Sequence, residues 1–469
     1  MKTQTKFFKK RVFIPLAMLA LGVTFAAGAC VEVKLDPKVD YLVMEFDTAS
    51  TPPRLPEPNV VTINPQTGLI DFSTAGLEVP EDCADASAVG LSMAQCEFYQ
   101  YLETLDGYPT LTPAKAPASG ALDMDTVSLP STVFVLEDTP DIWSANDLLV
   151  EFDEEDNILE MTPISGWEVG KQYVIAVRGY DDGVTGAQGE RVISNQVYFL
   201  LKQDESLMCD ATIPSQIPED CEYLQLLASE DADVEVVRAQ LASLEALRAG
   251  FIDAGAWESV ELLGDIPKEE IAILWAFPTH TASVAELNPV AGLLPQVEES
   301  PDRLLVPVKG TVDASSVSAF HPMANPSGSV YLVDLTELLA NNQAAAFPIF
   351  AATYEEASEA IVLEPDSPMV DSHLYVIILS DDLANEAGVP MVPSPVTVFL
   401  RSQGELIDGT GTSTVSSLDD ASAAELEAGR AMLQVLLDNP EFQDTTLLYG
   451  REQIVYLYAF TFPDPTTSD

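Results

Sequence analysis

The chain has 469 residues, of which 47% are hydrophobic, and it carries a formal net charge of −54 at pH 7. This length allows two or more hydrophobic cores, and this hydrophobic content excludes wholesale disorder. A surface so acidic repels nucleic-acid phosphates and anionic lipid headgroups, so we exclude nucleic-acid binding, whereas divalent cations and basic partners would be attracted.

The first thirty residues, MKTQTKFFKKRVFIPLAMLALGVTFAAGAC, predict an export signal. Basic residues precede an apolar stretch of signal-peptide length that ends in small residues. The ending AAGAC is similar to a bacterial lipobox, although Leu is commoner than Ala at the position of Ala27. We therefore expect a signal peptide over 1–29, lipidation of Cys30 and a lipid-anchored linker over 30–40. Plain cleavage after AGA is the alternative, but it leaves this Cys unexplained in a Cys-poor chain.

The other four cysteines form two local pairs in loops rich in Asp, Ser and Pro. Cys83 and Cys96 bracket one loop, and Cys209 and Cys221 bracket the other. An exported protein meets an oxidising compartment, so two short-range disulfides are the simplest interpretation, although other pairings of the four stay open. A zinc site would need two-residue spacings and usually a nearby His, and the sequence has neither.

Two stretches far apart in the chain follow the same pattern. YVIAVRGYDDGVTGAQGERVISNQVYFLL begins at Tyr173 and YVIILSDDLANEAGVPMVPSPVTVFL begins at Tyr375, and each reads as a strand, a polar turn and a second apolar strand. This repetition predicts an internal duplication. Further strands flank the two stretches in the same order, at 131–138, 158–163 and 271–277 in the first copy and at 328–335, 361–366 and 454–462 in the second.

Each copy consists mainly of short strands separated by Gly, Pro and Asp, which is typical of a β-sandwich. In YVIAVRG alternate residues fall on opposite faces, as a half-buried strand requires, whereas IAILWAF is apolar on both faces and must be central. Two amphipathic helices are predicted as well, over 233–251 and over 417–439, which opens on Ser417 and the acidic residues after it. We expect each helix to pack on its own sandwich, and a partner-binding groove is the alternative.

Acidic turns are the best candidates for a ligand site. EFDEEDN places Asp153, Glu155 and Asn157 at alternate positions, which a loop could wrap around calcium, and GYDDG adds Asp181 and Asp182. However, EFDEEDN lacks the Gly that an EF-hand loop requires after its third ligand, so a solvated β-turn is the plainer interpretation. Calcium stays open as a cofactor, and we assign no metal ligand.

Three segments carry a resemblance to a known family. They are 44–72, which contains FDTA and RLPEPN, 101–127, which contains LDGYPTLTP, and the turn segment GKQYVIAVRGYDDGVTGAQGERV. Together they resemble the N-terminal β-rich region of bacterial virulence-factor lipases, and the related Ig-like modules of surface-layer proteins and other bacterial surface lipoproteins. In that family FDP-like, PLPND-like and LDGFSTTAP-like phrases recur in the same order.

The resemblance, together with the duplication, implies a mainly β chain of tandem Ig-like β-sandwiches. The first Ig-like domain would span 41–280, with a helical insertion over about 206–265. The second would span 281–469, with a helical insertion over about 403–450. In each domain the inserted amphipathic segment comes before the last strand.

A lipase active site is not visible in the sequence. Such enzymes need the nucleophile elbow G-x-S-x-G, together with an acid and a His. The chain has no such pentapeptide, and the nearest match, GLSMA around Ser92, lacks the second Gly. The three histidines, His280, His321 and His373, each have a plain surface or capping interpretation. We therefore expect no catalytic residue and no enzyme activity.

Two function hypotheses follow. The favoured one is a non-enzymatic lipoprotein of the cell envelope, held in the outer membrane by its N-terminal lipid and facing the periplasm or the cell surface. Its tandem Ig-like domains would bind a protein or glycan partner, or would act as an adhesive or structural module. The alternative is an accessory or degenerate relative of surface lipases that recognises lipid or ester substrates or hydrolyses them weakly.

Overall fold

The computed structural model covers most of the chain after the predicted linker. It describes residues 40–47, 54–75, 77–137, 142–227, 233–287, 294–299, 302–438 and 450–462. The predicted signal peptide, Cys30 and all but the last residue of the linker lie outside these ranges.

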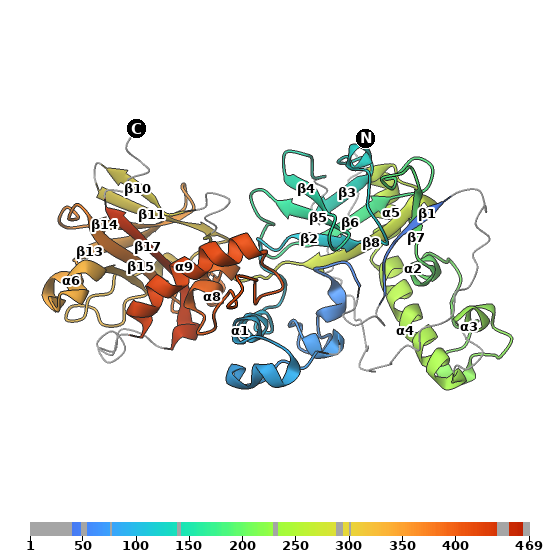
Figure 1. Ribbon diagram of the computed structural model, residues 1–469, viewed down its shortest axis with the longest axis horizontal. Helices are drawn as coiled ribbons and strands as arrows, with labels where there is room; N and C mark the ends of the chain where they lie inside the picture. Colours follow the sequence, from blue (N-terminus) through green and yellow to red (C-terminus); the bar gives the residue numbers. More distant parts are fainter. Residues whose placement is uncertain are drawn as a thin grey trace, which may run out of the picture. The chain divides into compact units, whose positions relative to one another are not determined.

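The chain folds as two compact units, labelled by element in Figure 1. Unit 1 combines the residues up to Glu78 with Glu103–Trp167 and Lys171–Thr279. Unit 2 combines Val79–Leu102 and Glu168–Gly170 with the chain from His280 onward. Unit 2 therefore includes a segment, Val79–Leu102, that precedes most of unit 1 in the sequence.

Unit 1 contains two antiparallel three-stranded sheets and one parallel strand pair. In the first sheet β5 lies between β2 and β4, and in the second β6 lies between β3 and β8. The parallel pair joins β1 to β7. The strands are β1 (Tyr41–Met44), β2 (Ala114–Pro117), β3 (Val133–Glu137), β4 (Leu148–Asp153), β5 (Ile158–Pro163), β6 (Gln172–Arg178), β7 (Arg191–Ser194) and β8 (Ile271–Pro278).

The chain between β7 and β8 is helical. The predicted helix over 233–251 is confirmed as α4 (Val234–Asp253), whose first turn is capped by the carboxylate of Asp233 and whose buried face includes Leu241 and Phe251. The other helices of unit 1 are η1 (Val60–Thr62), η2 (Phe72–Ala75), η4 (Met124–Thr126), α2 (Gln196–Leu201), η5 (Pro214–Gln216), α3 (Glu222–Leu227), α5 (Ala256–Gly264) and η6 (Lys268–Glu270).

Unit 2 contains a three-stranded antiparallel sheet, with β15 between β12 and β17, and a larger sheet in the order β13-β14-β11-β9-β16. Strand β10 also pairs with β11, and β16 is parallel to β9. The strands are β9 (Val284–Ala285), β10 (Gln296–Glu299), β11 (Asp302–Lys309), β12 (Val330–Asp334), β13 (Phe350–Glu355), β14 (Ala360–Pro365), β15 (His373–Ser380), β16 (Val392–Pro393) and β17 (Ile454–Phe462).

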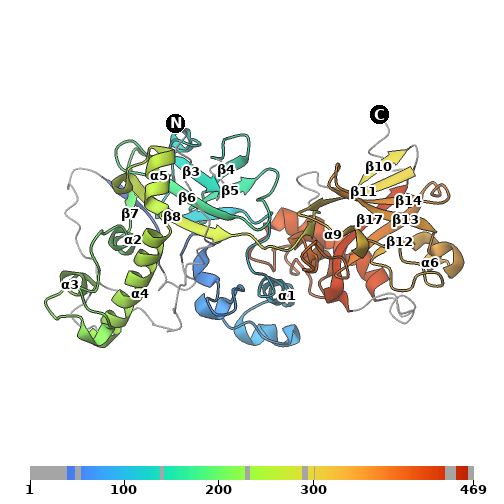
Figure 2. The same cartoon turned by 180° about the vertical axis from the view of Figure 1, so that it is seen from behind.

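The predicted helix over 417–439 corresponds to α9 (Asp420–Leu437). It begins after Asp419, whose carboxylate accepts the N–H groups of Ala421 and Ser422, and not at Ser417. Figure 2 shows α6 next to the end of β12. The other helices of unit 2 are η3 (Cys83–Val89), α1 (Met93–Leu102), η7 (Ala314–Ser316), α6 (Leu335–Leu339), α7 (Gln343–Ala346), α8 (Pro395–Arg401) and η8 (Arg451–Gln453).

One sheet of unit 1 is repeated strand by strand in unit 2. The sheet β3-β6-β8 has the same strand order and the same antiparallel sense as β12-β15-β17. Even the irregularities agree: the register of β6 against β8 shifts between Val177 and Arg178, and that of β15 against β17 shifts between Leu379 and Ser380. This repetition at the level of single residues agrees with the internal duplication that the sequence predicts.

The sequence predicts a second apolar strand in each repeated stretch, and this prediction is wrong for most of the strand's length. Strand β7 ends at Ser194, and the next residue, Asn195, accepts the N–H of Tyr198 (2.8 Å) and starts α2. In unit 2 the hydroxyl of Ser394 accepts the N–H of Thr397 (3.3 Å) and starts α8. Because these side chains satisfy free N–H groups of a first helical turn, they convert the apolar run into a helix.

Helices and strands contribute comparable shares of the described residues, so the chain is a mixed protein and not a mainly β one. Helices α3, α4 and α5 lie in the first predicted insertion and α9 lies in the second, but α1, α2, α6 and α8 lie outside both. No helix in the described ranges combines the length and the apolar character that a bilayer crossing requires.

Candidate functional site

The acidic turn between β4 and β5 contains Asp153, Glu155 and Asn157. The Asp153 carboxylate accepts hydrogen bonds from the N–H groups of Glu155 (2.8 Å) and Asp156 (3.3 Å). Asn157 has a φ of 55°, in the left-handed region that Asn tolerates better than most residues. The Asp153 side chain therefore closes the turn by accepting backbone N–H groups of the residues that follow it.

The turn after β6 places Asp181 and Asp182 beside arginines. Asp181 forms an ion pair with Arg191, and Asp182 lies 3.5 Å from a guanidinium nitrogen of Arg178. In the part of the chain that the structure describes, no three His, Cys, Asp or Glu side chains gather as a metal site would require. The calcium hypothesis therefore stays a prediction from the sequence alone.

The side chains of Ser92 and His321 bind backbone groups. The Ser92 hydroxyl donates to the carbonyl of Thr414 (2.8 Å) and accepts the N–H of Gln95 (2.9 Å), which makes it the cap of α1. The Nδ1 atom of His321 accepts two N–H groups of its own turn, each at 3.2 Å. His280 is buried. The structure does not bring Ser92 and a histidine together as a nucleophile and its base.

The third histidine belongs to a buried polar cluster that the sequence did not reveal. Its Nδ1 atom, on His373, lies 2.8 Å from Oδ2 of Asp334, which is 3% exposed. The other oxygen of Asp334 accepts the N–H of Glu337 (3.1 Å) and caps α6. The hydroxyl of Tyr375, opposite Asp334 in the sheet, accepts the N–H of Val370 (2.9 Å). Burial raises the pKa of Tyr375 to about 12, so this hydroxyl keeps its proton at neutral pH.

Unit 1 carries the same cluster at the equivalent positions. Glu137 ends β3 as Asp334 ends β12, and Tyr173 lies opposite it in β6 with its hydroxyl 3.3 Å from the carboxylate. Lys171, two residues before the tyrosine, places its ammonium 3.0 Å from Glu137. A carboxylate, a nitrogen-bearing side chain and a tyrosine thus recur in both units, with Lys171 in one and His373 in the other.

The His373 and Asp334 pair has the geometry of the acid and base of a hydrolase, but a triad also needs a hydroxyl or thiol on the imidazole. Asp334 is the side chain that hydrogen-bonds the ring within the described residues. In unit 1 the same position holds a lysine, which at neutral pH is a charged donor and not a base. What the two clusters share is the closure of a strand end by a buried carboxylate.

A cation lies at the end of α2 and of α8; Lys202 is buried and Arg401 is partly buried. The Lys202 ammonium donates to the carbonyls of Glu269 (3.2 Å) and Ile271 (3.0 Å) at the start of β8. The Arg401 guanidinium donates to the carbonyl of Arg451 (3.1 Å) and to two further carbonyls at the start of β17. Burial lowers the pKa of Lys202, and it lowers the pKa of Arg401 to about 10. Each cation fixes the start of the last strand of its unit.

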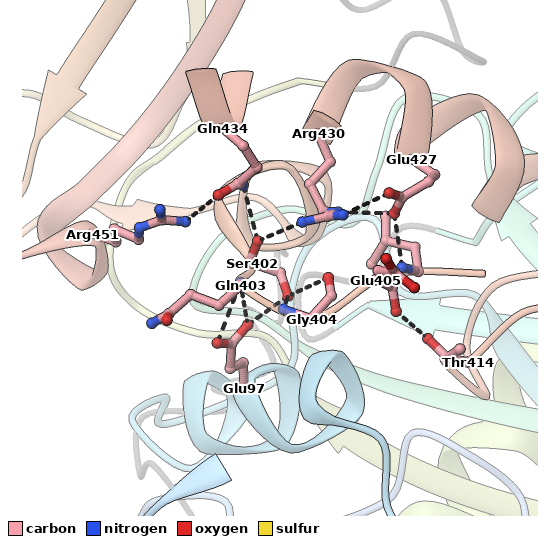
Figure 3. Close-up of polar contacts among 11 residues, drawn as sticks. Glu97, Ser402, Gln403, Gly404, Glu405, Thr414, Glu427, Arg430, Gln434 and Arg451 are labelled. Atoms are coloured by element: carbon pink, nitrogen blue, oxygen red, sulfur yellow. Dashed lines mark hydrogen bonds and ion pairs between the residues drawn. The ribbon is translucent and has the colours of Figure 1, made fainter. Parts of the chain in front are cut away.

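A carboxylate and an arginine on α9 hold the loop after α8 (Figure 3). Glu427 and Arg430 form a two-pronged ion pair at 2.8 and 2.6 Å. The carboxylate also accepts the N–H of Leu406 (2.8 Å), and the guanidinium donates to the carbonyl of Ser402 (3.3 Å). Burial acts to raise the pKa of Glu427, but the hydrogen bonds from Arg430 and Leu406 outweigh it and leave the pKa lowered.

Helix α4 repeats this clamp in unit 1. Glu245 and Arg248 pair at 2.8 Å, the carboxylate accepts the N–H of Leu207 (2.8 Å), and the guanidinium donates to the carbonyl of Gln203 (3.0 Å). The sequence holds a signal for it that the strand-based alignment missed, because LEALRA in α4 and LEAGRA in α9 match at the glutamate and the arginine.

The cysteines are joined as Cys83–Cys96 and Cys209–Cys221, the two local pairs that the spacing predicts. Both bonds close loops beside helices, and they indicate an oxidising environment.

No family model matches this chain, and no curated protein matches it. The resemblance to the N-terminal region of surface lipases therefore stays an expectation from the sequence.

Proposed function

We propose that the protein is a non-enzymatic, lipid-anchored protein of the cell envelope whose two homologous units form a binding, adhesive or structural module. One observation carries this proposal. The cation after α2 or α8 and the Glu–Arg pair on α4 or α9 occur in both units, and in both they bind the backbone of their own unit. Lys202 and Arg401, for example, donate to the carbonyls of Ile271 and Ile454, the first residues of β8 and β17. A side chain selected for a reaction would have no reason to recur in the second unit as a group that binds the backbone.

We also propose that each unit derives from an Ig-like sandwich. Support comes from the sheets of each unit, one of which ends on a mostly buried strand. These strands are β8 and β17, whose apolar side chains face both sides of the sheet. The helices before β8 and β17 would then be additions to the sandwich.

A relative of the surface lipases is the second candidate, and the Asp334 and His373 pair favours it. An imidazole oriented by a carboxylate is half of a hydrolase site. On this view the chain would recognise an ester and hydrolyse it weakly, or would assist a hydrolase elsewhere.

Hydrolysis of short acyl esters by the purified soluble body separates the two candidates. We expect the wild type to show the same background rate as His373→Ala and Ser92→Ala. A rate above background that is lost in His373→Ala would instead establish the hydrolase. A variant in an exposed turn, Asp153→Ala, serves as the matched control for non-specific effects.

The lipid anchor and the partner are tested in the host envelope. Expression of the full chain with a labelled fatty acid should label the wild type, and Cys30→Ala should remove the label and release the protein from the membrane fraction. Unlabelled wild type would contradict the anchor. A pull-down from envelope extract, with calcium and with a chelator, then tests for a protein or glycan partner and for calcium dependence.

A further inference from the structure

The segment Val79–Leu102 packs as a piece of unit 2, although the sequence on either side of it belongs to unit 1. It consists of η3 and α1, closed into a loop by the Cys83–Cys96 disulfide. Figure 1 shows α1 beside α8, with which it is in contact. The arrangement raises the question of why unit 2 takes this segment from so far away.

Side chains of the segment bind backbone N–H groups and one hydroxyl of the loop after α8. The Glu97 carboxylate accepts the hydroxyl of Ser402 and the N–H of Gln403 (3.1 Å), as Figure 3 shows. The side-chain oxygen of Gln95 accepts the N–H of Ser416 (2.6 Å). In these contacts the loop contributes mostly backbone groups, and the segment contributes side chains. The side chains of the segment therefore determine which sequence can bind there.

Apolar contacts complete the surface. Phe98 packs on Phe399 of α8, with ring centroids 4.8 Å apart, and both side chains are buried. The hydroxyl of Tyr101 donates to the carbonyl of Pro393 (2.6 Å) just before α8. The backbone of α1 also approaches Gly404 so closely that a side chain there would collide with Ala94. The match between the two surfaces therefore extends over polar, aromatic and backbone atoms.

Unit 1 shows what the segment replaces. Its equivalent helix, α2, is covered by the chain that directly follows it, where Leu200 packs with Leu207, Cys221 and Leu224. That cover is also closed by a disulfide, Cys209–Cys221. No cysteine follows Cys221 in the sequence, so the connection from α8 to α9 contains no disulfide, and the disulfide beside α8 is that of the segment.

We infer that α8 and the loop 402–416 form a specific docking surface for a disulfide-closed helical segment, and that Val79–Leu102 is its occupant. Unit 2 is complete only with this segment in place. The ligand class is a short helix that presents a carboxylate followed directly by one aromatic ring and, three residues later, by a second, as Glu97, Phe98 and Tyr101 do.

The test weakens the binding of the resident segment in the full mature chain and then adds the segment as a separate peptide. A double variant, Glu97→Lys with Phe98→Ala, removes the two central contacts of the resident segment. The probe is a dye-labelled, oxidised peptide of residues 79–102, and binding is followed by fluorescence anisotropy. We expect the double variant to bind the peptide about a hundredfold more tightly than the wild type does, since a tethered occupant competes at an effective concentration in the millimolar range.

Two matched peptides define specificity. A peptide with the same two substitutions should not bind, and the reduced peptide should bind about tenfold more weakly because it must order its loop on binding. Equal binding of the wild-type peptide to both proteins would overturn the inference. So would a double variant that is folded, with the far-ultraviolet circular dichroism of the wild type, and that binds no peptide.

Hydrogen exchange covers the case in which the double variant does not fold. Removing the bond in Cys83→Ser with Cys96→Ser should speed amide exchange at least about tenfold in α8 and in 402–416, without effect on α2. The matched pair Cys209→Ser with Cys221→Ser should do the reverse. Faster amide exchange in the segment, without faster exchange in α8, would contradict the inference. So would amides of α8 that are protected only at concentrations at which the protein dimerises.

Discussion

Replacing Lys202 with Met tests how strongly a buried cation holds the last strand of unit 1. Lys202 is 8% exposed, and its ammonium donates to the carbonyls of Glu269 and Ile271 and to the hydroxyl of Tyr180 (3.3 Å). Met fills similar space but leaves the buried carbonyl of Ile271 without this donor, at about 1–3 kcal/mol, and the part-buried carbonyl of Glu269 as well. Met also avoids the cost of burying a charge, which offsets part of the loss. We expect unit 1 to lose about 2–3 kcal/mol of its free energy of unfolding.

The distribution of tryptophan provides the assay. All the tryptophans lie in unit 1, so fluorescence follows the unfolding of that unit, while far-ultraviolet circular dichroism follows both units. With a urea dependence of about 2 kcal/mol per molar, the fluorescence midpoint should fall by about 1–1.5 M. The four residues are Trp143, Trp167, Trp257 and Trp275.

Two controls make the result specific. Lys202→Arg should keep the midpoint, because unit 2 uses an arginine at the equivalent place. Arg401→Met should leave the fluorescence transition unchanged and shift the part of the dichroism transition that belongs to unit 2. An unchanged fluorescence midpoint in Lys202→Met would refute the reasoning that the buried cation stabilises unit 1.

Three further predictions concern a helix cap, an ion pair and a disulfide. Asp334→Ala, which removes the cap of α6 and the partner of His373, should cost unit 2 about 2 kcal/mol in urea unfolding followed by circular dichroism; no change would contradict the cluster's role. Because the pKa of Glu427 is lowered in the folded protein, this carboxylate stabilises unit 2 at pH values above the pKa of an unfolded Glu, about 4.3. That stabilisation is lost as the pH falls through the folded pKa. Glu427→Gln should therefore reduce the loss of stability of unit 2 between neutral and acid pH, and an unchanged pH profile would contradict this. Cys209→Ser with Cys221→Ser should cost unit 1 about 3 kcal/mol by tryptophan fluorescence, against no shift for the same change at the other disulfide.

The strands and the duplication could be read from the sequence because apolar residues alternate, or run continuously, over five or more positions. Strands β6 and β15 lie where YVIAVRG and YVIILS predict them, and α4 and α9 follow the amphipathic pattern. Helices α2 and α8 were missed because their apolar runs are short. In such a run one capping side chain, Asn195 or Ser394, decides between strand and helix.

The polar clusters were missed for a different reason. A carboxylate at a strand end, such as Glu137 or Asp334, looks like a surface residue until the neighbouring strand is placed against it. The phrases LEALRA and LEAGRA could have identified the clamp of α4 and α9, because both residues of each pair lie on one helix. One sequence feature bears on the docking of Val79–Leu102 onto unit 2. No cysteine follows Cys221, so unit 2 has no disulfide after α8 of the kind that follows α2 in unit 1. Nothing local in the sequence says where a closed loop will pack.

Native-state hydrogen exchange tests most directly whether the chain is one architecture built twice. A duplicated fold should contain two slow-exchanging cores, one in β6 and β8 and the other in β15 and β17, with the amides beside both register shifts exchanging faster than their neighbours. A single slow core, or slow amides at unrelated places in the two units, would contradict the duplication on which the proposed function rests.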